Sequence, residues 1–369
     1  MNILKETYNN KKIFVTGHTG FKGAWLVRWL HQIGATVKGY ALPAEPSSLF
    51  YKMKGEYFCE SVHGDIRDAA KLKKELHDFE PDFVFHLAAQ SLVRESYRDP
   101  LYTYAANTLG TAHLLDALRG LQKKCTVVVI TTDKVYENLE RRAPYKETDR
   151  LGGYDPYSAS KACTEIITQS YQRAFFHADH YEEHEVAIAT ARAGNVIGGG
   201  DWAVDRLIPD IVRGLEKRET IVLRCPMAVR PWQHVLEPLY GYLLLGRALE
   251  RHPFDFAEGW NFGPEISDNL TVEEVVQRSL DVWGSGRYEV QATDDHFHEA
   301  NLLRLDIEKV KTRLHWRPVF SADVAIEKTI AWYRDYLNER MPAGDLVLRD
   351  IEEYEEKERG DGGAVSGER

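Results

Sequence analysis

The most informative stretch of the chain places an acid and a base directly after a strand pattern. Residues 127–130, VVVI, are all β-branched and predict a strand buried on both faces. Thr132, Asp133 and Lys134 follow almost at once. Neighbouring charges on a loop are usually a solvated pair that contributes little energy. These two, however, stand at the carboxyl end of a buried strand, where ligands of open α/β sheets bind. We therefore predict acid–base chemistry at Thr132, Asp133 and Lys134.

A second acid–base pattern opens a helical segment. Tyr157 and Lys161 stand in YDPYSASKACTE as Tyr-x-x-x-Lys. Residues four apart share one face of a helix, and a lysine so placed can lower the pKa of a phenol. A phenol with a lowered pKa serves as a general base near neutral pH. Taken alone, the pattern also fits a surface tyrosine and lysine.

A glycine-rich turn near the N-terminus predicts a nucleotide site. The segment TGHTGFKG carries glycines at positions 17, 20 and 23, after the first strand pattern and at the start of the first helical pattern. Such a turn lets the backbone approach a pyrophosphate, which then lies at the N-terminus of the helix. This context favours cofactor binding over a plain tight turn. The residues assigned to the cofactor are Gly17, His18, Thr19, Gly20, Phe21, Lys22 and Gly23.

Two further segments extend the predicted cofactor site. HGDIRD ends a short apolar stretch with a carboxylate that can meet an adenine amino group, and HLAAQ ends a strand in small residues that leave room for a flat cofactor. The residues selected are Asp65, Ile66, Leu87, Ala88 and Ala89. The second strand offers Tyr40 and Ala41 where an acid usually holds the ribose of NAD. These residues leave NAD and NADP as alternatives.

The order of the segments predicts the fold class. The first half of the chain alternates strand-like and helix-like segments, which predicts an α/β fold with a doubly wound parallel (Rossmann) sheet. We place a dinucleotide-binding domain at residues 1–190, with segments from about 231–260 returning to it. A smaller, interleaved α/β substrate domain occupies residues 191–345. Residues 350–369 are charged and poor in apolar side chains, so we expect a disordered tail.

Composition narrows the class of protein. The 369 residues carry a formal charge of −10, which argues against a general nucleic-acid binder, because such proteins need a basic surface. The four cysteines form no CxxC pair, and no apolar run approaches the ~20 residues of a membrane span. The N-terminus is too polar for a signal peptide, so we expect a cytoplasmic protein without a membrane partner. No metal site is expected, and the histidines clustered in two polar stretches are assigned to the surface: His177, His180, His184, His296 and His298.

Together with Asn107 in AANTLGT, these motifs resemble the extended short-chain dehydrogenase/reductase superfamily, over nearly the whole chain to about residue 340. The resemblance implies NAD as cofactor, with Asn107 in its site, and matches Thr132, Tyr157 and Lys161 to the catalytic triad. Tyr157 would take the proton of a sugar hydroxyl while hydride passes to the nicotinamide. Lys161 would hold the nicotinamide ribose and tune the tyrosine. The resemblance also implies a homodimer or homotetramer that pairs the long helical patterns at 104–121 and 158–176.

Within that superfamily, GHTGFKGAWL, TTDKVYEN and RPWQHVLE look most like the CDP-glucose 4,6-dehydratases. Those enzymes convert CDP-glucose to CDP-4-keto-6-deoxyglucose for deoxysugar synthesis. The resemblance implies that Asp133 protonates the departing C6 hydroxyl, whereas epimerases usually carry small or uncharged residues there. Lys134 stands where most similar dehydratases carry glutamate. It either removes the C5 proton or organises the site, and both roles stay open.

A nucleotide diphosphate requires local cations in a chain of net negative charge. Guanidinium forks match phosphate oxygens well, and LRCPMAVRPWQHVLE supplies two arginines. The resemblance implies that Arg230 faces the pyrophosphate and that Asn195 contacts it or the sugar. Salt bridging or exposure is the expected role of the other arginines. The predicted substrate-binding residues are Gln90, Ser91, Arg94, Asn195, Arg224 and Arg230.

Two alternatives to a CDP-glucose dehydratase remain at this stage. One is a neighbour on the same fold, either a dehydratase of another nucleotide hexose or an epimerase. The other is a non-catalytic dinucleotide-binding redox sensor, which would have no reason to keep Thr132, Asp133, Tyr157 and Lys161 together.

Overall fold

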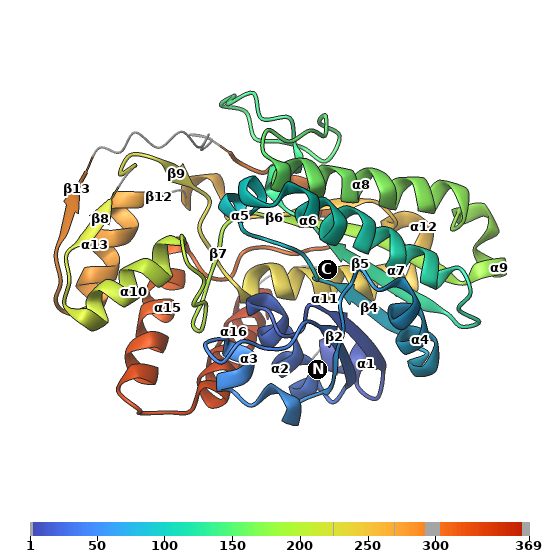
Figure 1. Ribbon diagram of the computed structural model, residues 1–369, viewed down its shortest axis with the longest axis horizontal. Coiled ribbons are helices and arrows are strands. Elements are labelled where there is room, and N and C mark those ends of the chain that lie inside the picture. The colour runs from blue at the N-terminus through green and yellow to red at the C-terminus, as the bar shows by residue number, and fades with distance from the viewer. Residues whose placement is uncertain (1–2, 224, 269, 292–302, 364–369) are drawn as a thin grey trace.

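The protein is built around one parallel sheet. The computed structural model describes residues 3–223, 225–268, 270–291 and 303–363. The sheet strands are β1 (Lys12–Thr16), β2 (Thr36–Ala41), β3 (Glu60–His63), β4 (Phe83–His86), β5 (Cys125–Ile130), β6 (Val186–Ala193) and β11 (Gly259–Phe262). They pair in parallel in the order β11-β6-β5-β4-β1-β2-β3 (Figure 1). The predicted doubly wound α/β fold is confirmed.

The strand order reverses between β1 and β4, which pair with each other although a long stretch of chain separates them. Open α/β sheets bind their ligands in the crevice beyond the carboxyl ends of the strands at such a reversal. The glycine turn follows β1, the HLAAQ segment ends β4, and the segment with Thr132 follows β5. The fold therefore brings three predicted site segments to one edge of the sheet.

Helices cover both faces of this sheet. Those that lie against it are α2 (Phe21–Ile33), α4 (Ala69–Phe79), α7 (Gly110–Leu118), α8 (Pro156–Ala174) and α11 (Leu236–Arg251). Ile13 and Val15 pack in one core with side chains of α2 and α11, while Phe14 packs in the other with side chains of α4 and α7. Side chains alternate between the two faces of a strand, so β1 contributes to both cores.

A second lobe consists of short strands and amphipathic helices, at the left of Figure 1. Its helix α13 begins at a capping box, in which Thr271 and Glu274 each bond to the other's backbone. The elements of this lobe are α10 (Leu207–Lys217), β8 (Ile221–Leu223), β9 (Val229–Arg230), β12 (Leu270–Thr271), α13 (Val272–Trp283), β13 (Tyr288–Val290) and α15 (Ala322–Leu337). The remaining short elements are α1 (Ile3–Tyr8), α3 (Leu49–Lys52), α5 (Val93–Arg98), α6 (Pro100–Tyr104), α9 (Tyr181–His184), β7 (Val196–Ile197), β10 (Gln233–His234), α12 (Pro253–Phe256) and α14 (Glu308–Arg313).

The segment after residue 231 returns to the larger lobe. Helix α11 packs against β5 and β6, and β11 adds a strand beside β6. The division into two domains near residue 190 stays a prediction, as does the extent of the smaller one.

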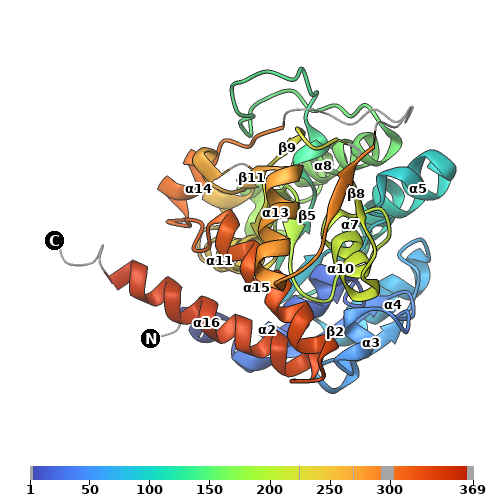
Figure 2. The same cartoon turned by 90° about the vertical axis from the view of Figure 1, so that its left-hand side faces the viewer.

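The expected disorder of residues 350–369 is wrong up to residue 363. Helix α16 (Ala343–Gly363) continues through this segment and packs on α2 (Figure 2). Ile351 and Tyr354 are buried, and the Tyr354 hydroxyl donates to Glu237 of α11 at 2.9 Å. A few apolar side chains at helical spacing were enough to dock a highly charged helix. Residues 364–369 lie outside the described part of the chain.

Candidate active site

The segment after β5 turns its acid inward. Residues Asp133–Val135 form one 3-10 turn, whose N-cap Thr132 accepts from the Lys134 amide. Asp133 is 3% exposed, and the Thr132 hydroxyl donates to its Oδ1 at 2.9 Å. Burial raises the pKa of Asp133, while Lys134 and the Thr132 hydrogen bond oppose the rise. A carboxyl group that keeps its proton to higher pH than usual fits a general acid.

The helix α8 presents Tyr157 and Lys161 to the same place. Burial raises the pKa of Tyr157 to about 12, and a hydrogen bond with Thr132 and the charge of Arg206 oppose the rise. The Lys161 ammonium donates to the Ile130 carbonyl at 3.0 Å, and burial lowers its pKa to about 8. The structure thus brings the predicted catalytic residues together. The cation that lowers the pKa of Tyr157 here is Arg206, where the spacing had indicated Lys161.

The Thr132 hydroxyl stands between the acid and the base. It bonds to the Asp133 carboxylate, and it also hydrogen-bonds with Tyr157. A hydroxyl carries one proton and two acceptor lone pairs, so it donates to only one of these partners at a time. When Asp133 is protonated it can donate to Thr132, which frees the threonine proton for the Tyr157 oxygen. The protonation states of the acid and the base are therefore coupled through one side chain.

The glycine turn forms a cradle for a pyrophosphate. Gly17 has φ +74°, and a Cβ added there would lie 2.7 Å from the Ala88 amide nitrogen, so only glycine fits between the turn and the end of β4. A Cβ on Gly23 would lie 2.2 Å from the Gly17 oxygen. Because glycine has no Cβ, α2 can pack directly behind the turn. The N-terminus of a 13-residue helix points its amide groups at this place. These residues fit NAD, with Leu87, Ala88 and Ala89 beside the turn at the end of β4.

Two of the predicted cofactor residues use their side chains elsewhere. The His18 ring is buried against Gly39, and its Nε2 lies 2.7 Å from the Ser61 hydroxyl. Burial lowers the pKa of His18 to about 4, so the ring is neutral. Both oxygens of the Asp65 carboxylate accept from Arg67, which lowers the pKa of Asp65. His18 therefore contributes backbone alone, and Asp65 is engaged by a neighbouring cation.

The other predicted cofactor residues hold the site together. Asn107 lies in a π-helical turn, Ala105–Leu109, of the kind that often marks a functional position. Its Oδ1 accepts from the Gln90 amide at 2.8 Å, and its Nδ2 donates to the Ser160 hydroxyl at 2.9 Å. Lys22 lies near Tyr242, with Nζ 3.4 Å from its hydroxyl, and burial lowers the Lys22 pKa to about 7. Smaller contacts place the rest: Thr19 donates to the Leu42 carbonyl, Phe21 approaches Gly198, and Ile66 packs under Gly110.

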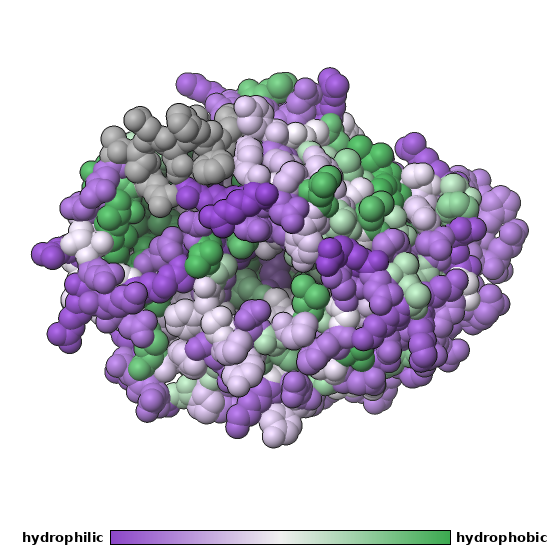
Figure 3. Space-filling view, viewed as in Figure 1, coloured by the Kyte–Doolittle hydropathy of each residue, from purple (hydrophilic) through white to green (hydrophobic). Residues whose placement is uncertain are grey.

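The predicted substrate residues divide into three groups. Arg230 and Asn195 belong to the segments beside Asp133, and the charge of Arg230 opposes the rise in the Asp133 pKa. Ser91 and Arg94 face the second lobe, where Ser91 accepts from Arg206 at 3.3 Å. The Gln90 side chain bonds to Thr103 and to the Leu92 backbone, so it shapes its own loop. Arg224 lies outside the described residues. Figure 3 shows a hollow between the two lobes on the face viewed.

A family model for GDP-mannose 4,6-dehydratases matches residues 14–329, which reaches into both lobes and includes every residue of the site described above. The chain belongs to the GDP-mannose 4,6-dehydratase family. A CDP-glucose 4,6-dehydratase of Salmonella typhimurium is 45% identical over 354 residues, which is 95% of this chain and 98% of that protein.

Solved structures of a dehydratase and of an epimerase share this fold. The dTDP-glucose 4,6-dehydratase DesIV from Streptomyces venezuelae, crystallised with NAD, superposes with a TM-score of 0.75 at 26% identity, covering 90% of this chain and 99% of its own. A UDP-glucose 4-epimerase from Thermotoga maritima shares the fold, with a TM-score of 0.73 at 22% identity over 88% of this chain and 99% of its own.

Arg206 is a site residue that the sequence patterns missed. It precedes α10 in the second lobe, where it bonds to Asp201 at 2.8 Å and reaches across to Ser91. Its charge also acts on Tyr157 and Lys22. In WAVDRLIPD it is one charged residue before an amphipathic helix, so only the folded chain reveals it.

The remaining predictions concern the histidines, metal binding and the membrane. His177 and His180 are exposed and His184 is half-buried, while His296 and His298 lie outside the described residues. Among the described residues no three His, Cys, Asp or Glu side chains gather where they could hold a metal ion. No helix in the same part of the chain is long and apolar enough to cross a membrane.

Proposed function

We propose that this chain is an NAD-dependent CDP-glucose 4,6-dehydratase, which converts CDP-D-glucose to CDP-4-keto-6-deoxy-D-glucose and water. The observation that carries the proposal is the buried Asp133, held against Thr132 and Tyr157 at the carboxyl end of β5. An epimerase needs the tyrosine and the lysine, but it needs no acid for a departing hydroxyl. The choice of cytidine rests on the 45% identity, over 95% of this chain, with the Salmonella enzyme.

In the proposed mechanism, Tyr157 and Asp133 each transfer one proton. Tyr157 removes the proton of the C4 hydroxyl, with Thr132 donating a hydrogen bond to the phenolate. When bound, NAD would supply the acceptor for the C4 hydride and would return that hydride to C6. The resulting C4 carbonyl acidifies C5–H, so a base removes this proton while Asp133 gives its own proton to the departing C6 hydroxyl, which leaves as water. A proton returns to C5 when hydride reaches C6. The Gly17–Gly23 turn would hold the cofactor pyrophosphate, and Lys161 would hold the nicotinamide ribose.

Lys134 has two candidate roles, as the C5 base or as an organiser of Asp133. It lies half-buried on the same turn, and its charge opposes the rise in the Asp133 pKa. A Lys134→Met variant distinguishes them by exchange of the C5 proton with solvent deuterium. Loss of exchange with retained C4 oxidation assigns the base to Lys134, and retained exchange assigns the organising role.

The substrate and assembly complete the proposal. Arg230 and Asn195 are proposed to contact the diphosphate and the sugar, with Ser91 and Arg94 near the hexose.

We propose a homodimer or homotetramer that pairs α7 and α8 across a two-fold axis. Leu109, directly before α7, and Ile166 of α8 are each 54% exposed. Apolar side chains on adjacent helices fit such a pairing. The four cysteines are free, and we place the protein in the cytoplasm.

A turnover assay with separate substrates tests the function. The holoenzyme is incubated with NAD and with CDP-, dTDP-, GDP- or UDP-glucose, and the product mass is read by mass spectrometry. Loss of one water from CDP-glucose is expected. Loss from another nucleotide alone would keep the chemistry and overturn the cytidine assignment. Unchanged mass with all four would overturn the dehydratase and, if NAD is bound, favour the redox sensor. Loss of turnover with intact binding in a Tyr157→Phe variant would exclude a pure sensor.

A further inference from the structure

Behind the catalytic turn lies an ion pair that is closed off from solvent. Glu165 of α8 and Arg192 of β6 expose 0% and 2% of their side chains. The guanidinium binds both carboxylate oxygens, with Nε–Oε1 and Nη2–Oε2 distances of 2.9 Å. Thr131 and Thr190 donate to the same oxygens at 2.5 and 2.6 Å. A buried charge pair is tolerated when its remaining lone pairs are satisfied in this way.

This pair holds both ends of the catalytic segment, defined here as Thr131–Tyr136. Thr131, at its start, donates to Glu165. At its end, the Tyr136 hydroxyl accepts from Arg192 Nη1 at 2.7 Å and donates to Asn261 of β11, also at 2.7 Å. Thr132, Asp133 and Lys134 lie between these two anchors. The anchoring groups come from the neighbouring strands β6 and β11 and from helix α8, which packs on β6, so the segment is held at both ends.

Glu165 also lies one helical turn beyond Lys161. Both side chains are buried on α8, and the Glu165 carboxylate opposes the effect of burial on the Lys161 pKa. Residues four apart on a helix are close enough for this interaction. The Lys161 ammonium meanwhile donates to Ile130, the residue directly before the catalytic segment. One carboxylate therefore contacts the segment and supplies counter-charge to the lysine.

We propose that Glu165 and Arg192 form a clamp that positions the catalytic segment against Tyr157 and keeps Lys161 charged. Both act through other residues, so they are positioning residues of the dehydratase. The inference rests on the proposed function for its assay, and it adds residues that neither the tyrosine–lysine pattern nor the acid–base pair identified.

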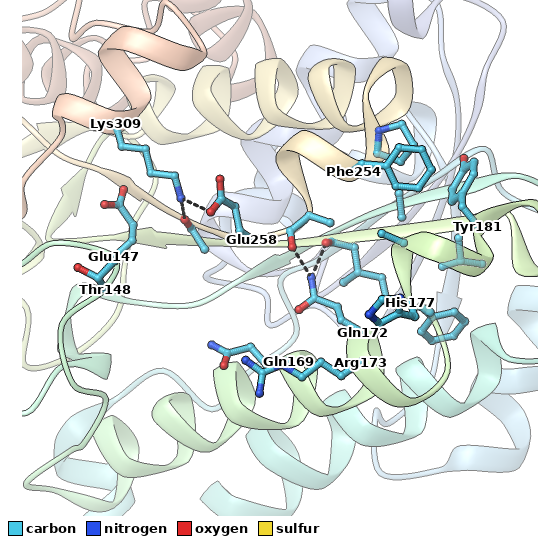
Figure 4. Close-up of a pocket in the computed structure, with 18 of the residues that line it drawn as sticks. Glu147, Thr148, Gln169, Gln172, Arg173, His177, Tyr181, Phe254, Glu258 and Lys309 are labelled. Atoms are coloured by element: carbon cyan, nitrogen blue, oxygen red, sulfur yellow. Dashed lines mark hydrogen bonds and ion pairs between the residues drawn. The ribbon is translucent and has the colours of Figure 1, made fainter.

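The far side of the clamp opens onto a pocket. Arg192 borders a cavity of about 560 Å³, and its Nη1 also donates to the Glu147 carbonyl at 3.2 Å. Figure 4 shows Glu147, Gln169, Arg173 and Lys309 around this cavity. A planar cation that enters the cavity can therefore reach the position of the guanidinium once the arginine side chain is removed.

The first test is the pH profile of kcat/KM for Glu165→Gln. Loss of the carboxylate removes the charge that opposes burial at Lys161, so Lys161 loses its proton at lower pH. We expect the alkaline limb to move to lower pH by about 1 unit or more, the size of shift that one nearby opposite charge produces. Thr190→Val is the matched control, because it removes a donor to Glu165 and keeps the carboxylate. Its limb is expected to stay in place.

The single variant leaves a buried guanidinium without its counter-charge, which can prevent folding. The double variant Glu165→Gln/Arg192→Met removes both charges and is measured beside it, with folding checked by circular dichroism. A folded variant with a limb unmoved from the wild type would overturn the clamp. Absence of turnover in the wild type would instead overturn the proposed function, so the two failures are distinguishable.

Chemical rescue provides the second readout. Arg192→Ala is expected to lose at least tenfold in kcat, and millimolar guanidinium chloride is expected to restore most of that loss. Urea has the same planar shape without the charge, so equal rescue by urea would overturn the role of the ion pair. Failure of guanidinium to restore a folded Arg192→Ala protein would overturn it as well. Wild-type activity with each additive provides the baseline.

Discussion

Replacing Thr132 with valine tests whether its hydroxyl couples the acid Asp133 to the base Tyr157. Valine keeps the shape of threonine but removes the hydroxyl that hydrogen-bonds with Tyr157 and donates to Asp133 at 2.9 Å. A hydrogen bond to a charged group contributes about 1.5–3 kcal/mol, and one pKa unit corresponds to about 1.4 kcal/mol. Loss of the bond to the phenolate therefore raises the Tyr157 pKa by about 1–2 units. The raised pKa reduces the ionised fraction at neutral pH about 10- to 100-fold.

The assay is kcat for water loss at neutral pH and over the pH range in which the protein stays folded, as checked by circular dichroism. Because the Tyr157 pKa of about 12 lies above this range, the ionised fractions of wild type and variant rise in parallel with pH, and Thr132→Val should stay about 10- to 100-fold slower throughout. Thr132→Ser retains the hydroxyl and should keep the wild-type rate. A valine variant as fast as the wild type, or a serine variant as impaired as the valine variant, would refute the reasoning.

Three further predictions follow from the geometry. Gly17→Ala should weaken NAD binding at least ~10-fold, as measured by isothermal titration calorimetry. The left-handed backbone costs alanine about 1–2 kcal/mol, and its Cβ would lie 2.7 Å from the Ala88 nitrogen. Unchanged affinity would mean that the turn does not hold the cofactor. Asp133→Asn should slow water loss about 10²- to 10⁴-fold while C4 oxidation persists, seen as a build-up of reduced-cofactor absorbance in stopped flow, and equal loss of both steps would contradict its role as the acid. Burial raises the pKa of Glu237 from 4.5 to about 7, so the folded state binds this proton more tightly than the unfolded state. The contribution of this group to the free energy of unfolding, about 3 kcal/mol, is therefore lost as pH rises from 4.5 through 7. Thermal unfolding of Glu237→Gln should lack this decline, and parallel curves of stability against pH for the two proteins would exclude the contribution of Glu237.

Local sequence was sufficient for the parts of the site that follow directly from one strand or one helix. The Val127–Ile130 run predicted β5, and a parallel sheet places whatever follows such a strand at the ligand edge. The spacing of Tyr157 and Lys161 placed both on one face of α8. The glycine turn was predicted from its position between a strand and a helix, and the positive φ of Gly17 gives the physical reason.

Side-chain direction and long-range partners were beyond the sequence patterns. The His18 ring turns away from the cleft because Gly39 on the neighbouring strand leaves space for it. Arg67, two residues on, engages Asp65 where an adenine contact was predicted. Arg206 reaches Tyr157 only because the second lobe folds back over the sheet. Glu165 and Arg192 meet because α8 packs on β6, and no spacing in the chain indicates that contact.

The same limit explains the tail. From residue 350 onward the composition is that of a disordered segment, yet α16 docks through Ile351 and Tyr354 and bonds to Glu237 far away in the chain. Composition averages over a segment, whereas docking depends on a few side chains that share one helix face.

The central claim is that hydride leaves C4 and returns to C6 of one sugar while water departs. Turnover of CDP-glucose that carries deuterium at C4, analysed by mass spectrometry and NMR of the product, tests it most directly. The account predicts a product that has lost one water and carries the deuterium in its C6 methyl group. Deuterium that remains at C4 of a product of unchanged mass would contradict the account and indicate an epimerase.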